Sequence, residues 1–258
     1  GTLVRSDDTV SAFTHEVLDR VRAAGIPVVG ATGRGPRLTE LTRNDIRAAD
    51  FLVLAGGGRV VDQSDPGGPV VLRDERLSGS VLAEMLTALE AELGPLTMMV
   101  EALDGHDAPL WGDFDPIWPY PDLFEARTRS ECVGADVIKA FIRTADHDVD
   151  ALLAAARRIV TPEQASLTQA GLGFVEICPP GVDKATGLTV VAESLGVDPA
   201  EVLVFGDMPN DLPMFEWAGW GRVAVANAHP TVREAADEIT LRNDDDGVAV
   251  YLDRLLSR

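Results

Sequence analysis

The chain alternates between short apolar runs and longer segments in which apolar residues recur every three or four positions. Short apolar runs are typical of strands buried in a parallel sheet, and the longer periodicity is typical of amphipathic helices. Strands are predicted at 26–32, 51–54, 202–205 and 222–225, and helices after Ser11, after the strand at 51–54, and from Lys184 and Gly247. This alternation predicts right-handed crossovers and a Rossmann-like parallel sheet, which is an α/β fold.

The middle of the chain carries a second set of elements. Two amphipathic helices are predicted there, one with Leu82, Met85, Leu86, Leu89 and Leu93 on one face, the other with Val149, Leu152, Leu153 and Ala156. Strand-like runs at 96–100, 137–142, 167–170 and 174–177 surround them. The sequence therefore predicts a core domain of residues 1–64 and 181–258 and an inserted α/β domain of residues 65–180.

The segment from Val202 to Asp211 is an apolar strand that runs into a turn carrying two carboxylates and an amide. Ligands of such sheets gather outside the carboxyl ends of the strands, which is where Asp207 lies. Magnesium uses one or two protein carboxylates, with water and phosphate oxygens completing its octahedron. Asp207 is therefore a candidate metal ligand. The alternative is a structural turn, since Asp and Asn side chains bond their own backbone.

A second strand end points to phosphate. The strand at 26–32 ends in Thr32, Gly33 and Arg34, which offer a hydroxyl, freed backbone N–H groups and a guanidinium. These donors suit a phosphate dianion. Alternatively, Thr32 caps the next helix and Arg34 is a solvated surface charge.

A third candidate is Lys184, which follows a Pro/Gly turn and opens a helix. A lysine in the first turn opposes the positive end of the helix dipole, so this placement is locally unfavourable and suggests a use. An ammonium placed beside a phosphate and a carboxylate would act as a point charge. The alternative is that Lys184, like most lysines, is solvated.

Together these segments resemble a known family. The order of Ala31-Thr32-Gly33-Arg34, Lys184 in Gly181-Val182-Asp183-Lys184, and Gly206-Asp207-Met208-Pro209-Asn210-Asp211 resembles the haloacid dehalogenase superfamily, and within it the Cof-like, cap-bearing phosphatases. Gly1-Thr2-Leu3 looks like the tail of that family's opening Asp-x-Asp-Gly-Thr signature. The likeness runs the whole length and implies that residues 65–180 form a cap over the active site.

The resemblance also implies a reaction: Mg²⁺-dependent hydrolysis of a small phosphomonoester through an aspartyl-phosphate intermediate. Two aspartates, the nucleophile and the acid/base, are expected just upstream of Gly1, and the natural protein is therefore predicted to continue there. The resemblance implies that the catalytic residues are Thr32, Lys184, Asp207, Asn210 and Asp211. It implies that the substrate is bound by Thr32, Gly33, Arg34, Lys184 and Asn210. It implies that the metal is bound by Asp207 and Asp211; alternatively, Asp211 orients Lys184 or metal-bound water.

One segment departs from the family pattern. Ala55-Gly56-Gly57-Gly58 follows the strand at 51–54, and relatives usually carry an asparagine at the position of Gly56. Consecutive glycines permit positive φ angles or a close backbone approach to a ligand. The alternative is a flexible turn into the next strand.

Composition narrows the possible partners. The net charge of −20 argues against nucleic acid and against anionic membrane surfaces, so a phosphate site must be positive locally. No apolar run is long enough for a membrane helix, and the cytoplasm is the default location.

Cys132 and Cys178 match no zinc spacing and are expected to be reduced and buried. The aromatic residues Trp111, Phe114, Trp118 and Tyr120 are predicted to fill the second domain's core or, alternatively, to hold a substrate ring.

Three other functions fit parts of the pattern. A phosphosugar mutase would use the same core and a similar cap and would return the phosphoryl group to its substrate. A catalytically inactive binding protein would keep the fold and lack the nucleophile. A receiver-type signalling domain uses a similar set of Asp, Thr and Lys residues. Such a domain does not require the more than one hundred residues that separate Thr32 from Lys184 here.

Overall fold

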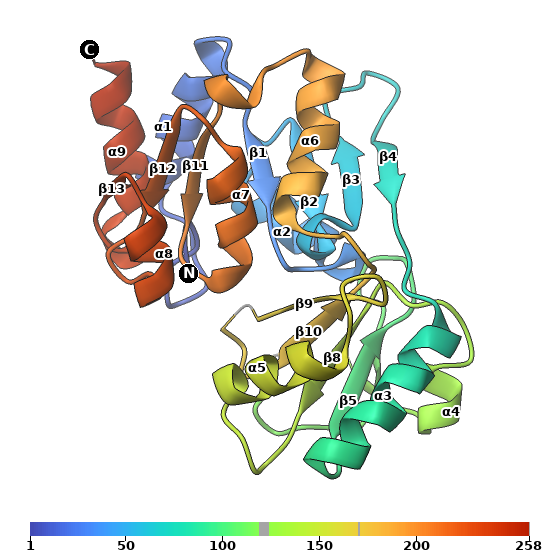
Figure 1. Cartoon of the computed structure of the whole chain (residues 1–258). Coiled ribbons are helices and arrows are strands. Elements are labelled where there is room, and N and C mark those ends of the chain that lie inside the picture. Colours follow the sequence, from blue (N-terminus) through green and yellow to red (C-terminus); the bar gives the residue numbers. More distant parts are fainter. Residues whose placement is uncertain (119–123, 170, 258) are drawn as a thin grey trace.

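A computed structural model describes residues 1–118, 124–169 and 171–257, which form two α/β domains joined by two linkers (Figure 1). The first core sheet has the order β1-β2-β3-β4 and the second has the order β11-β12-β13. Their bounds are β1 Val29–Ala31, β2 Phe51–Leu54, β3 Arg59–Asp62, β4 Val70–Asp74, β11 Leu203–Gly206, β12 Gly221–Ala224 and β13 Glu238–Ile239. β1 is parallel to β2, and β11 to β13 are parallel to one another, which confirms the predicted α/β class.

The helix predicted after β2 is wrong. The chain turns instead through a short 3-10 segment, η2 (Ala55–Gly57), into β3, which runs antiparallel to β2. β4 then pairs antiparallel with β3 in the same sheet. The predicted boundary at residue 65 thus falls before a strand that belongs to the core sheet. The glycine-rich segment permits this reversal, because Gly56 and Gly57 have φ angles of 67° and 114°.

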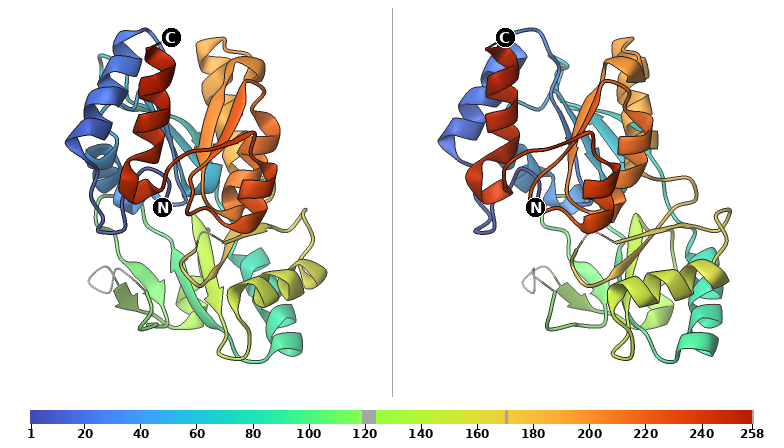
Figure 2. Two further views of the ribbon diagram at one scale, coloured as in Figure 1. Left: turned by 90° about the vertical axis from the view of Figure 1, so that its left-hand side faces the viewer. Right: turned by 60° about the vertical axis from the view of Figure 1, so that its left-hand side comes forward.

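Helices cover both sides of the core sheets (Figure 2). They are α1 (Ala12–Ala23), α2 (Thr39–Asp45), α6 (Lys184–Leu195), α7 (Leu212–Trp217), α8 (Pro230–Ala235) and α9 (Gly247–Leu256). As predicted, α1 begins after Ser11, whose side chain accepts a hydrogen bond from the Thr14 N–H at 3.0 Å. α1 lies beside α9, while α6 packs beside α7 on the other side.

An apolar cavity of about 340 Å³ lies between the two core sheets. Its walls include Val29 and Ala31 of β1, Val204 of β11, and side chains of α1, α6 and α9. β1 and β11 are not paired with each other in the described structure, so the core contains two sheets rather than the single sheet that the pattern predicts.

The second domain is a sheet with the order β7-β6-β5-β8-β10-β9, covered on one face by helices. Its elements are α3 (Gly79–Leu93), β5 (Thr97–Glu101), β6 (Leu110–Gly112), β7 (Phe124–Ala126), α4 (Arg129–Cys132), β8 (Lys139–Arg143), α5 (Val149–Ile159), β9 (Ser166–Thr168) and β10 (Val175–Cys178). The four predicted strands occur as β5, β8, β9 and β10 and the two predicted helices as α3 and α5, whereas β6, β7 and α4 were not predicted. Because side chains alternate along a strand, Val100, Ala140 and Ile177 pack against the helices.

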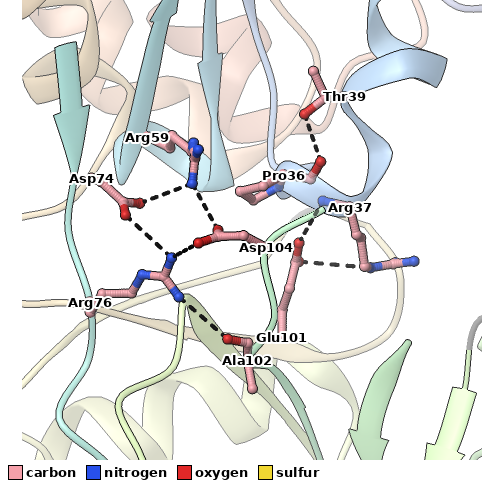
Figure 3. Close-up of polar contacts among 9 residues, drawn as sticks. All are labelled: Pro36, Arg37, Thr39, Arg59, Asp74, Arg76, Glu101, Ala102 and Asp104. Atoms are coloured by element: carbon pink, nitrogen blue, oxygen red, sulfur yellow. Dashed lines mark hydrogen bonds and ion pairs between the residues drawn. The ribbon is translucent and has the colours of Figure 1, made fainter. Parts of the chain in front are cut away.

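A cluster of ion pairs ties the linkers together where the domains meet (Figure 3). Asp104 of the second domain accepts from Arg59 of β3 at 2.8 Å and from Arg76 at 2.6 Å. Asp74 lies between the same two arginines, at 3.5 Å from Arg59 and 3.2 Å from Arg76. These groups are partly exposed, so each pair contributes little to stability, although together they fix the linker geometry.

The sequence also led to predictions about the two cysteines and about membrane-spanning helices. Cys132 and Cys178 are buried free thiols, and burial raises their pKa values to about 11 and about 12, respectively. Within the described part of the chain, none of the helices combines the length and apolar character needed to cross a bilayer.

The turn at η2 yields a matched pair of substitutions. A Cβ on Gly57 would lie 1.9 Å from the carbonyl oxygen of Asp183, the residue that caps α6, whereas a Cβ on Gly56 would meet nothing within 4 Å. Both residues have positive φ, which costs an alanine about 1 kcal/mol. We expect Gly56→Ala to cost only that amount and Gly57→Ala to cost about 3 kcal/mol or more, measured by urea unfolding. Equal costs would contradict the close approach of η2 to α6.

Candidate active site

A cavity of about 320 Å³ opens where β1 and β11 end and α6 begins, and residues of both domains line it. All seven residues proposed for the site line this cavity: Thr32, Gly33, Arg34, Lys184, Asp207, Asn210 and Asp211. They come from three distant parts of the sequence. The residues after β1 and after β11 meet at this cavity although the two strands belong to separate sheets in the described structure.

Lys184 is the first residue of α6 and is buried. The helix begins there because Asp183 and Thr186 form a reciprocal capping box. The ammonium group donates to Oδ1 of Asp211 in a short, buried hydrogen bond. This carboxylate offsets the unfavourable position of a cation at the positive end of the helix, so Lys184 is held inside the cavity wall rather than solvated.

Asp211 also shapes the loop after β11. Its Oδ2 accepts hydrogen bonds from the backbone N–H groups of Asp207 and Met208, at 2.8 and 2.9 Å. Both oxygens are therefore engaged by Lys184 and by the loop. These contacts favour the role of orienting Lys184 over direct metal ligation, and the assignment of Asp211 as a metal ligand stays a prediction.

Asp207 differs from Asp211 because its carboxylate is less engaged. Oδ1 accepts a short hydrogen bond from the Thr2 hydroxyl, and Oδ2 has no hydrogen-bond partner among the described residues. A Cβ added to Gly1 would lie 2.0 Å from Oδ2, so only a glycine lets the backbone lie against this carboxylate. No cluster of three or more potential metal-ligating side chains occurs in the described ranges. One available carboxylate still suits magnesium, which takes most of its ligands from water and phosphate.

The loop after β1 presents the Thr32 hydroxyl. Its oxygen accepts from the Arg34 N–H at 3.1 Å, which leaves the hydroxyl proton available for a ligand. The Arg34 guanidinium is paired with Asp45 of α2 at 2.5 Å. Arg34 therefore lines the cavity as part of an ion pair and not as an unpaired cation. Its predicted contact with substrate remains untested.

Asn210 is also buried against the cavity. Its side-chain amide makes no hydrogen bond to another residue of the described structure. A buried amide without a protein partner retains its full capacity to bind a ligand. This observation agrees with the predicted role of Asn210 in substrate binding.

Four charged residues over the cavity were not predicted from the sequence. Arg37, Glu101, Lys139 and Glu176 are each 3% exposed or less, and all four line the same cavity. Glu101 and Lys139 are directly opposite each other in β5 and β8, and Glu176 lies in the adjacent strand β10. The signal available in the sequence was a charged residue within each of three mostly apolar strands. Because side chains alternate along a strand, these charged residues lie on the face of the sheet opposite the helices.

These four residues connect the two domains. Lys139 donates to the carbonyl oxygen of Gly33 at 2.6 Å and to Glu176 at 3.0 Å. The Arg37 N–H donates to Glu101 at 3.3 Å, and its guanidinium lies 3.8 Å from the same carboxylate (Figure 3). A Cβ on Gly35 would lie 2.0 Å from the Glu101 carboxylate, so this approach requires glycine. The second domain therefore contacts the predicted phosphate loop directly.

Burial and the neighbouring charges shift the pKa values of Glu101 and Lys139 in opposite directions. Burial raises the pKa of Glu101 despite the nearby cations Lys139 and Arg37. Burial also penalises the Lys139 ammonium, but Glu176 and its other neighbours outweigh that effect and raise its pKa. Lys139 therefore remains a cation in this cluster.

The aromatic residues between positions 111 and 120 lie in different environments. Trp118 is buried and packs edge to face on Phe141, with ring centroids 4.8 Å apart, and both line the cavity. Trp111 packs against the helical side of the second domain, whereas Phe114 is exposed. Tyr120 lies outside the described residues.

Comparison with known proteins identifies the family. A model of haloacid dehalogenase-like hydrolases matches residues 1–105 and 121–252. The chain is 28% identical over 280 residues to a 5-amino-6-(5-phospho-D-ribitylamino)uracil phosphatase of Bacillus subtilis, covering 100% of this chain and 96% of that protein. It is 30% identical over 258 residues to a phosphoglycolate phosphatase of Natronomonas pharaonis, covering 98% of this chain and 93% of that protein.

Solved structures agree. A haloacid dehalogenase-like hydrolase from Bacteroides thetaiotaomicron matches with a TM-score of 0.74 and 27% identity, over 99% of this chain and 96% of that one. A protein from Streptococcus mutans shares the fold with a TM-score of 0.84 and 17% identity, over 100% of this chain and 96% of that one. The chain therefore belongs to the haloacid dehalogenase-like hydrolases. The resemblance to the Cof-like phosphatases of that superfamily is confirmed.

The buried pair of Lys184 and Asp211 is open to a direct test. Asp211→Asn would leave a buried ammonium without its carboxylate, and removing one partner of a buried pair costs about 3–5 kcal/mol. We expect urea unfolding to show a loss of that size, with part of it recovered in the double variant Lys184→Met/Asp211→Asn. Asp237→Asn, which breaks the exposed pair with Arg222, is the matched control. A loss no larger than the control's would contradict the pair's role.

Proposed function

We propose that this protein is a magnesium-dependent phosphatase that hydrolyses a small phosphomonoester through an aspartyl-phosphate intermediate. The observation that carries the proposal is that Thr32, Lys184 and Asp207, which are far apart in sequence, line one cavity. A hydroxyl donor, an ammonium and an available carboxylate are the groups needed to hold a phosphoryl group beside a divalent ion. The phosphatase names of the curated relatives support the same reaction class.

The charges of the cavity wall support a requirement for magnesium. Each cation lining the cavity is paired with a carboxylate: Arg5 with Asp246, Arg34 with Asp45, Arg37 with Glu101, Lys139 with Glu176 and Lys184 with Asp211. The Asp207 carboxylate has no such cation beside it among the described residues. A phosphate dianion entering this wall would meet no net positive charge. Magnesium held by Asp207 would supply that charge and neutralise the phosphoryl oxygens.

The side chains then have distinct roles in the proposal. The Thr32 hydroxyl and the Asn210 amide would donate hydrogen bonds to the phosphoryl oxygens. Lys184, fixed by Asp211, would neutralise the phosphate and the attacking carboxylate. Closure of the cap over the cavity would exclude bulk water and strengthen each of these interactions.

The nucleophile is proposed to come from a strand that precedes Gly1 and occupies the cavity between β1 and β11. Its carboxylate would attack phosphorus in line as the bond to the leaving oxygen breaks. The second aspartate would protonate that oxygen and then take a proton from the water that hydrolyses the aspartyl-phosphate. This division replaces one difficult displacement by two easier ones.

Metal dependence tests the proposal most simply. A protein that carries the upstream Asp-x-Asp segment should hydrolyse p-nitrophenyl phosphate with Mg²⁺ and lose the activity in excess chelator. Asp207→Asn should lower kcat by about 10²-fold or more, because the cation would lose its ligand. Asp146→Asn, at an exposed position in the second domain, should leave the rate unchanged. Equal rates with and without chelator would rule out the proposed chemistry.

A second prediction separates binding from turnover. A chain that begins at Gly1 should bind inorganic phosphate in the presence of Mg²⁺, because Thr32, Lys184 and Asp207 are all present. It should not hydrolyse p-nitrophenyl phosphate, because the proposed nucleophile is missing. Turnover by that chain at the rate of the extended protein would refute the assigned nucleophile.

A further inference from the structure

The segment that precedes α1 lies against the Asp207 carboxylate without belonging to a helix or a strand. Residues 1–9 form neither element, yet the Thr2 hydroxyl donates to Oδ1 of Asp207 and Gly1 lies close to Oδ2. The Leu3 side chain packs against the apolar core, which leaves the peptide groups of the segment to be fixed in another way. Because no sheet or helix ladder holds this backbone, side chains from elsewhere must position it.

Two asparagines lie at the same edge of the second core sheet as Asp207. β11 pairs parallel with β12, and β12 pairs parallel with β13, so the loops that follow these strands lie in a row. Asp207 directly follows β11, and Asn227 lies in the loop after β12. Asn243 comes after β13, where it opens the 3-10 segment η6 (Asn243–Asp245). Strand pairing therefore brings the three side chains together from separate parts of the sequence.

Both asparagines bind the backbone of the N-terminal segment. The Asn227 amide donates to the carbonyl oxygen of Gly1 at 3.0 Å, and the buried Asn243 amide donates to the carbonyl oxygen of Val4 at 2.9 Å. The Asn243 N–H also donates to Oδ1 of Asn227 at 2.9 Å, which orients the first amide. Among the described residues, no other hydrogen bond reaches the peptide groups of residues 1–4. The position of this backbone thus depends on the two asparagines.

The loop that carries Asn227 also holds the backbone of Asp207. The His229 N–H donates to the Asp207 carbonyl oxygen at 2.8 Å, two residues along the chain from Asn227. One short loop therefore contacts both the segment, through Gly1, and the residue that carries the carboxylate. These contacts fix the segment and the carboxylate relative to each other.

The residues that follow Asn243 extend this contact. Asp244 accepts hydrogen bonds from the N–H and the hydroxyl of Ser6, at 2.8 and 2.9 Å. Asp246 forms an ion pair with Arg5 at 2.6 Å. These two carboxylates are engaged by the segment itself, so this acidic stretch has a structural role in holding it.

We propose that Asn227 and Asn243 are positioning residues that hold residues 1–4 against Asp207 and thereby orient its carboxylate toward a divalent ion. With the Thr2 hydroxyl on Oδ1, the second oxygen stays available for the ion. Neither asparagine is among the described residues that line the cavity, so both act through the segment and not on the ligand. The inference rests on the proposed function, which supplies the assignment of Asp207 as the metal ligand.

Metal binding tests the proposal without requiring turnover. Mn²⁺ is the probe, because it takes the same oxygen ligands as Mg²⁺ and its free concentration can be followed by electron paramagnetic resonance. The chain is titrated with Mn²⁺ in the presence of inorganic phosphate, and the binding that Asp207→Asn removes defines the site. Asn227→Ala and Asn243→Ala should each weaken that binding about fivefold or more, because each removes one hydrogen bond to the segment. Unchanged affinity in both variants would overturn the proposal.

A matched control and a double variant separate positioning from general loosening. Thr240→Val removes a hydrogen bond of the same kind, from the Thr240 hydroxyl to the Gly247 carbonyl oxygen at 2.6 Å, without touching residues 1–4. It should leave the Mn²⁺ affinity unchanged, and a loss equal to that of the asparagine variants would overturn the proposal. Thr2→Val removes the contact through which the segment reaches Asp207. Asn227→Ala should therefore weaken binding by less than about twofold in a Thr2→Val background, whereas fully multiplicative losses would contradict the shared route.

Two outcomes distinguish this inference from the proposed function. If Asp207→Asn binds Mn²⁺ as tightly as the wild-type chain, the assigned metal site is wrong and the positioning role falls with it. If Asp207→Asn weakens binding but the asparagine variants do not, the metal site stands and only the positioning role fails. A thermal melt of each variant shows whether it is folded. Asn227 is only partly buried, so Asn227→Ala keeps the test decisive even if Asn243→Ala, at a buried position, fails to fold.

Discussion

The bidentate use of one buried carboxylate, Asp211, holds this site together. One of its oxygens fixes the ammonium of Lys184 at the start of α6, and the other fixes the backbone of the loop that carries Asp207. A helix end and a strand end from different parts of the sequence are thereby locked to a single group. The geometry of the cation and of the available carboxylate follows from that constraint. Without Asp211, a buried lysine would oppose the helix dipole with no partner.

The second constraint is charge balance in an acidic protein. A chain with a net charge of −20 must create a local site for a phosphate dianion, yet the cations around this cavity are each paired with a carboxylate. The pairing lets several buried charges coexist. It also means that a phosphate needs a further positive charge, and the Asp207 carboxylate is the group suited to hold one.

The sequence predicted the site residues whose positions depend on short stretches of the chain. Thr32, Lys184 and Asp207 were found because each follows or opens an element whose apolar pattern is clear. The antiparallel strands β3 and β4 were missed because the glycines before β3 permit a reversal that apolar periodicity does not encode. The four charged residues over the cavity were missed because Lys139, Glu101 and Glu176 meet through strand pairing, and Arg37 meets Glu101 through domain packing. Both depend on contacts that are distant in sequence.

The central claim is that residues from three parts of the chain grip one phosphoryl group beside one divalent ion. A crystal structure of the protein grown with Mg²⁺ and inorganic phosphate tests it most directly. The account predicts the metal against the Asp207 carboxylate and the phosphate within hydrogen-bond distance of the Thr32 hydroxyl and the Lys184 ammonium. A phosphate bound away from Thr32 and Lys184, or a metal that does not contact Asp207, would contradict it.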